Sequence, residues 1–330
     1  MEIDYRNELF QPCEYYYYVN SFIFKSNYTI LLKYLVILFA FVLSSVYAQD
    51  YVDVLKIGYS NTFKNDFTGT TQSTDVRVFE TNLTYPMVID ENNALITGID
   101  FASNRLQLFP NSEFTSLYTA TLKIGLAKTF NEKWSGTFVF LPKIASDYRN
   151  ITRDDFYVGG YSLLKLKKKE NLIYRFGIYG STEAFGFFTT PIFGWYYLSP
   201  SKRFEMDVSL PVAVDINYRV GAVTLGVDYM GIGRSFNVNP ENSPKVYADV
   251  SSLDFATYTQ FNFVDDSVLL RAKLGYSSNN YEVYTDGDKI DLGLSAFSFG
   301  DDRTQLNPDI NGSLFFKLEA IYRFKITDTQ

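Results

Sequence analysis

Charged side chains recur at every second residue within otherwise apolar stretches of this sequence. A period of two belongs to an extended strand and places such side chains on one face of it. In the last stretch, Leu314 to Ile326, an apolar face alternates with a charged one. Across the chain, this pattern selects twelve candidate functional residues: Lys123, Arg175, Glu205, Asp207, Asp215, Arg219, Asp228, Arg271, Lys273, Lys317, Glu319 and Arg323.

Two roles are open to a sheet face that carries both signs of charge. The charges could line a water-filled pore and set its selectivity. They could instead pair with one another and fill a narrow interior, because buried opposite charges require partners. The sequence leaves both interpretations open.

Catalysis has little support in the composition of the chain. There is no histidine, which is the commonest general base, and the one cysteine is Cys13. The remaining candidates for catalysis are a Ser–Lys pair and a carboxylate pair such as Glu205 and Asp207, which are two apart on one strand. We expect no enzymatic activity, no catalytic or metal site and no cofactor.

The elements that position these charges are predicted antiparallel strands. Clear alternation marks stretches such as Ser116 to Phe130. Short turns near Asn131, Lys167, Ser199 and Val264 alternate with longer loops, of which Ser181 to Thr190 and Gly231 to Ala248 are two. Lipid cannot satisfy the backbone groups of an open sheet edge, so a spanning sheet must close into a barrel. We therefore predict an all-β fold, a transmembrane antiparallel up-and-down β-barrel with apolar residues facing lipid and charges facing the lumen.

The number of strands depends on Pro211. If Pro211 marks a tight outer hairpin, the chain has about 14 strands; if residues 203–219 form one strand, twelve is the alternative. Both numbers are even, as in single-chain bacterial barrels.

Aromatic residues make up 18% of the chain and are expected at the membrane interfaces. The predicted girdle comprises Trp134, Trp195, Tyr196, Tyr197, Tyr322 and Phe324. The loop of residues 286–311 is apolar for an exposed segment, with Leu292, Leu294, Phe297 and Phe299, and we expect it to fold over the mouth of the barrel.

The first 48 residues have the features of a leader. Lys33 precedes an apolar run, and small residues up to Ala48 precede Gln49. The run from Tyr34 to Ala48 has 15 residues, fewer than the roughly 20 that a membrane-spanning helix needs. We expect a signal peptide within residues 1–48, an over-long N-terminus with a true start near Ile30, and a barrel domain at residues 49–330.

The net charge of −7, without a basic block, argues against a nucleic-acid partner. The expected partners are outer-membrane lipid and, during biogenesis, the outer-membrane assembly machinery.

Several motifs resemble an uncharacterised family of outer-membrane β-barrel proteins common in the Bacteroidota. They are Phe176-Gly-Ile-Tyr179, the turn Tyr196-Tyr-Leu-Ser-Pro200, the break Ser209-Leu-Pro211 before a strand reaching Tyr218, and the aromatic last strand. The resemblance covers about residues 50–326 and implies a domain of unknown function located in the bacterial outer membrane. It implies no activity. This chain departs from many such barrels in continuing past Phe324 to Gln330.

Two functions follow from these expectations. The first is a porin-like channel for passive transport of a small solute or hydrophobe. The alternative is a structural or surface-interaction barrel with a closed lumen.

Overall fold

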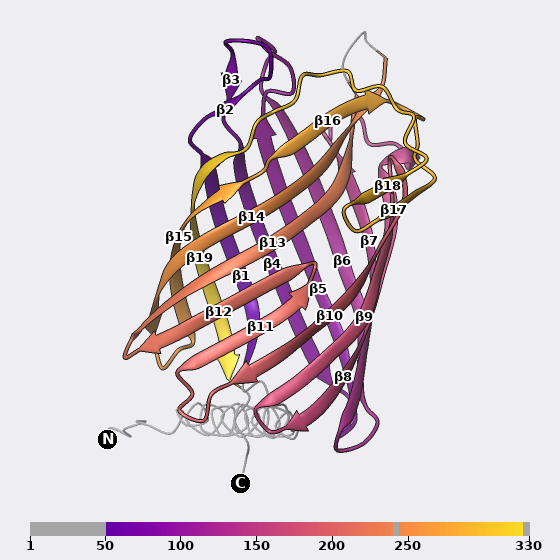
Figure 1. The fold of residues 1–330 in the computed structure, drawn as a ribbon. Coiled ribbons are helices and arrows are strands. Elements are labelled where there is room, and N and C mark those ends of the chain that lie inside the picture. Colours follow the sequence, from indigo (N-terminus) through magenta and orange to yellow (C-terminus); the bar gives the residue numbers. More distant parts are fainter. Residues whose placement is uncertain (1–50, 240–243, 326–330) are drawn as a thin grey trace, which may run out of the picture. The chain divides into compact units, whose positions relative to one another are not determined.

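The computed structural model describes residues 51–239 and 244–325, which form an antiparallel sheet closed on itself (Figure 1). Each wall strand pairs with its neighbour in the chain, and β19 (Ser313–Lys325) closes the ring on β1 (Tyr51–Thr62), with Ile57 opposite Ala320. The other wall strands are β4 (Arg77–Val88), β5 (Asn93–Leu106), β6 (Thr115–Thr129), β7 (Trp134–Ser146), β8 (Phe156–Lys169), β9 (Leu172–Glu183), β10 (Gly186–Leu198), β11 (Phe204–Leu210), β12 (Ala213–Val220), β13 (Val223–Val238), β14 (Val246–Phe263) and β15 (Val268–Ser277). The predicted 14-strand antiparallel barrel is confirmed.

Short elements occupy the end of the barrel that carries the long loops. They are β2 (Asn65–Asp66), β3 (Ser73–Thr74), the 3₁₀ turn η1 (Arg153–Asp155), β16 (Asn280–Thr285), β17 (Leu292–Leu294) and β18 (Phe297–Phe299). No helix within residues 51–239 and 244–325 is long and apolar enough to cross a membrane. The predicted leader, residues 1–48, lies outside the described residues.

The wall has its apolar face outside and its polar face inside. On β19, Leu318 is 57% exposed, whereas the side chain of the next residue, Glu319, is 2% exposed. A soluble protein buries its leucines and exposes its glutamates. The reversed arrangement is that of a barrel wall with hydrocarbon outside and a polar lumen inside.

The β11–β12 hairpin is much shorter than the strands beside it (Figure 1). It turns at Pro211 and Val212, which confirms the tight hairpin predicted there. Its last contact with β13 is the bond from the Gly231 amide to the Val212 carbonyl oxygen, 2.9 Å long. β10 and β13 continue beyond this turn toward the long-loop end. β11 and β12, which separate them nearer the short turns, do not extend that far.

Above the hairpin, β13 crosses to the far wall. A parallel bridge joins Asn237 of β13 to Ser146 of β7, and the Asp147 amide donates to the Asn237 carbonyl oxygen at 2.9 Å. Between these walls lies a packed apolar cluster, here called the outer core: Phe67, Val76, Leu106, Leu108, Leu117, Ala145, Tyr157, Phe236, Val238, Ala248, Val250, Tyr281, Val283 and Ile310. The outer core fills the axial end of the lumen on the long-loop side.

Three local expectations are wrong. Residues 181–190 are not a loop, because β9 and β10 are joined by a two-residue turn at Ala184 and Phe185. Tyr196 does not belong to the outer girdle: it is 1% exposed and faces inward, since its strand neighbours Trp195 and Tyr197 face outward. The 286–311 loop covers the mouth only with its last part, where Ile310 packs into the outer core. Its β17–β18 hairpin docks on the edge of β10 instead, with Phe188 opposite Gly293, and leaves Phe297 and Phe299 exposed.

Candidate functional site

The structure places ten of the twelve candidate residues around one cavity of about 1610 Å³ inside the barrel. The other two, Lys123 and Arg175, lie behind the cavity surface. Lys123 pairs with the cavity carboxylate of Asp100 at 2.7 Å, and Arg175 pairs with that of Asp207. The alternation in the sequence therefore brings all twelve to the interior, where most of them meet a charge of opposite sign.

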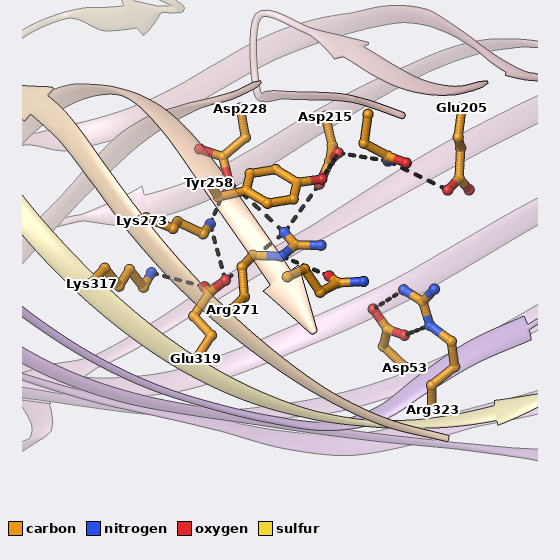
Figure 2. A network of polar contacts seen from close by, with 12 residues as sticks. Asp53, Glu205, Asp215, Asp228, Tyr258, Arg271, Lys273, Lys317, Glu319 and Arg323 are labelled. Atoms are coloured by element: carbon orange, nitrogen blue, oxygen red, sulfur yellow. Dashed lines mark hydrogen bonds and ion pairs between the residues drawn. The ribbon is translucent and has the colours of Figure 1, made fainter. Parts of the chain in front are cut away.

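The middle of the cavity holds a network of charges centred on Arg271 of β15 (Figure 2). The guanidinium lies 3.1 Å from Asp215 and 3.9 Å from Glu319, and it stacks 4.0 Å from the centre of the Tyr258 ring. Its Nε donates to Gln260 at 2.9 Å. Only 8% of the Arg271 side chain is exposed, so these partners replace most of its water.

Strand register explains why Glu319 belongs to this network. Lys273 on β15 lies directly opposite Lys317 on β19, and like charges in that position repel each other. The Glu319 carboxylate reaches both ammonium groups, at 3.1 Å from Lys273 and 3.3 Å from Lys317. Lys317 also contacts Glu80 of β4 at 2.5 Å, while Lys273 contacts Asp228 of β13. We call Glu80, Asp215, Asp228, Tyr258, Gln260, Arg271, Lys273, Lys317 and Glu319 the central network.

A second group narrows the cavity near the short-turn end. Arg323 contacts Asp53 at 2.6 Å and stacks 3.5 Å from the centre of the Tyr51 ring. The Tyr51 hydroxyl donates across the interior to Glu205 at 2.6 Å, and Tyr196 donates to the same carboxylate at 3.0 Å. Both interpretations of the charged face thus find support: the charges are paired, and they still surround a cavity. Their role in selectivity stays a prediction.

Several cavity residues were missed from the sequence, among them Glu80, Asp100 and Arg234. A signal for Glu80 was present, because Phe79, Leu83, Tyr85 and Met87 alternate around it, and all four are exposed on the outer wall. Arg234 was hidden within a stretch that the sequence assigns to a loop, although it lies in β13. Within the described residues, no group of three or more His, Cys, Asp or Glu side chains could hold a metal ion.

Another cluster, which also lines the cavity, holds the 286–311 loop on β14 and β16. Arg303, with 3% of its side chain exposed, contacts Asp249 and Asp301 at 2.9 Å each and lies 3.9 Å from the centre of the Tyr284 ring. Hydrogen bonds from Arg303 lower the pKa of Asp301. A carboxyl whose pKa falls on folding stabilises the fold above its ordinary pKa and loses that effect as the pH falls through the folded value.

Arg303→Ala is expected to release this loop. Losing a hydrogen-bonded ion pair costs about 1.5–3 kcal/mol, which corresponds to a tenfold or greater rise in the open population. Limited chymotrypsin digestion of the membrane-embedded protein at pH 7 measures that rise. The matched control is Lys289→Ala, because Lys289 is an exposed residue of the same loop. Equal cleavage of both variants would contradict the assigned role of Arg303.

A family model described as "Domain of unknown function (DUF6268)" matches residues 44–253. No curated protein matches the chain. Among solved structures, the chain is similar to an outer-membrane channel from Pseudomonas putida F1, with 11% identity and a TM-score of 0.42 over 82% of this chain and 93% of that one.

Two further solved structures are similar. The TodX monoaromatic hydrocarbon channel, in a deltaS2 mutant, has 11% identity and a TM-score of 0.35 over 83% of this chain and 91% of its own. OccAB4 of Acinetobacter baumannii has 10% identity and a TM-score of 0.27 over 84% and 100%. Identities this low indicate nothing about a shared function.

Proposed function

We propose, from the premise that this chain belongs to the DUF6268 family of domains of unknown function, that it is an outer-membrane channel for the passive passage of small solutes. The family is the kind that the motifs around Tyr196 and Pro211 predict, although its distribution in the Bacteroidota stays a prediction. No activity comes with the family, so the proposal is based on the barrel itself.

The outer wall supports a membrane location. Exposed apolar side chains occupy the outward positions of successive strands, such as Leu274 on β15, Leu318 on β19 and Phe261 on β14, each about half exposed. An apolar band that runs round a closed barrel is far larger than the patches that soluble monomers tolerate. A bacterial barrel of this kind belongs in the outer membrane.

The cavity is the single observation that carries the channel proposal. Its lining includes Lys202 and Asp266, which lie in short turns at one end, and Ser298 of the β17–β18 hairpin, which lies on the outside of the barrel near the other. The residues that line the cavity therefore extend from the short-turn end to the outer surface. Because both signs of charge line it, we expect weak discrimination between cations and anions.

Planar-bilayer recording tests this proposal. We expect discrete current steps from the reconstituted protein, with a cation-to-anion permeability ratio within about threefold of one. The packed outer core favours the alternative of a structural barrel with a closed lumen. A protein that inserts into the bilayer but carries no current would establish that alternative.

A further inference from the structure

The wall of the barrel has a gap on one side, and the cavity reaches it. The gap begins above the turn at Pro211 and Val212 and ends where the Ser235 amide donates to Glu183 at 2.9 Å. On one side of this gap β17 pairs with the edge of β10, and the other side is β13, where Gly231 to Ser235 spans roughly 14 Å of extended chain. We call this opening the side gap. The β17–β18 hairpin thus occupies part of the gap beside β10, and the opening that remains lies between this hairpin and β13 (Figure 1).

One aromatic ring spans the upper part of the side gap. Phe188 of β10 faces inward and lines the cavity. A Cβ built on Gly233 of β13 would lie 3.5 Å from its ring, and one built on Gly293 of β17 would lie 2.9 Å from it. Phe188 is thus held between two glycines from strands on either side, and any larger residue at Gly293 would displace it.

The side gap is the route that the outer core leaves open. The outer core fills the axial end, since Phe236 and Leu117 from facing walls are both fully buried in it. The cavity lining instead continues through Met230, Ile232 and Phe188 in the side gap to Phe297 on the outer surface. A solute that enters from the short-turn end must therefore leave sideways.

The lining changes character along this route. The rim exposes Met230, Leu253 and Phe297, at 48%, 45% and 68%, with only the small polar Ser251 and Ser298 beside them, whereas the cavity behind it carries the central network. A fully polar solute would lose water at the exposed apolar side chains of the rim and gain few partners there, and a fully apolar one would desolvate the charges inside. A molecule with a polar end and one apolar chain meets neither penalty.

Building on the proposed channel, we propose that single-chain amphiphiles pass between the lumen and the surrounding lipid through the side gap, with Phe188 as its gate. The polar head travels along the charged lumen, and the apolar tail slides past Phe188 and the rim into hydrocarbon. The near balance of charge in the lumen suits a zwitterionic or neutral head.

Two substitutions change the side gap in opposite directions. Phe188→Ala removes the phenyl ring from the side gap. Gly233→Trp adds an indole ring to it, at a position where no backbone atom lies within 4 Å of the new Cβ. We expect the single-channel current to rise about threefold in the first variant and to fall about threefold in the second, because an apolar constriction controls wetting of the path. Phe193→Ala and Thr257→Trp, both on outward-facing positions of β10 and β14, are matched controls and should leave the current unchanged.

The outcomes separate this inference from the proposed function. Current that responds to neither Phe188→Ala nor Gly233→Trp would overturn the sideways route and leave the channel intact. Absence of current in the wild type and in Phe188→Ala would overturn both.

The solute class is tested by a pair of probes that share one head. Dodecylphosphocholine below its micellar concentration should block the current at a concentration at least about tenfold lower than phosphocholine alone, because its tail binds in the apolar rim. Gly233→Trp should remove that difference. Equal block by both probes in the wild type would overturn the assignment to amphiphiles.

Discussion

Arg271→Met is expected to lower the free energy of unfolding of the barrel by about 3–5 kcal/mol. Arg271 is the one cation that contacts three carboxylates of the central network, those of Asp215, Asp228 and Glu319. Methionine fills a similar volume without charge, so these acids would be left close together in a site with little water. Urea unfolding of the lipid-reconstituted protein, followed by the fluorescence of Trp134 and Trp195, measures the loss.

Arg219→Met is the matched control for this prediction. Arg219 also faces the cavity and contacts Asp266 at 2.6 Å, but 40% of its side chain is exposed near a turn. Exposed ion pairs contribute about 1 kcal/mol or less, so this variant should unfold close to the wild-type midpoint. If the two variants lost the same stability, the central network would be a set of solvated pairs and not a buried unit.

The strand alternation was enough to predict the wall and the interior charges. Arg271, Lys273 and Glu319 each lie between apolar residues that face lipid, so a period of two assigns their face without knowledge of the partners. Their mutual contacts could not be read in the same way. The contact between Lys317 and Glu80 joins residues from opposite ends of the chain, and it exists because β19 closes the barrel on β1 beside β4.

The sequence also fails to predict the end of β13, which is buried on both faces. Ser235 to Val238 at the end of β13 are all buried, since one face packs into the outer core and the other meets β9 and η1. These four residues alternate polar and apolar side chains, but Gly231 and Gly233 precede them and Pro240 follows, and the sequence therefore predicts a loop there. Tyr196 shows a related limit: three consecutive aromatic residues do not reveal which one faces inward.

Phe236→Ala is the second substitution with a large expected effect, because it removes the centre of the outer core. Phe236 is 0% exposed. Truncating a fully buried phenylalanine costs about 3–5 kcal/mol, from lost transfer free energy and from the cavity that remains. The same urea unfolding measures this loss. Phe261→Ala on β14 is the control, since that ring is 48% exposed on the lipid side and should cost about 1 kcal/mol or less.

The conductance of Phe236→Ala then shows which opening solutes use. If they leave through the side gap, loosening the outer core changes stability but leaves the single-channel current as it is, whereas Phe188→Ala changes the current. If Phe236→Ala raises the current and Phe188→Ala does not, the path is axial and the outer core is its gate. The two phenylalanines lie on β13 and β10, on opposite sides of the contact between Ser235 and Glu183, so each variant tests one route.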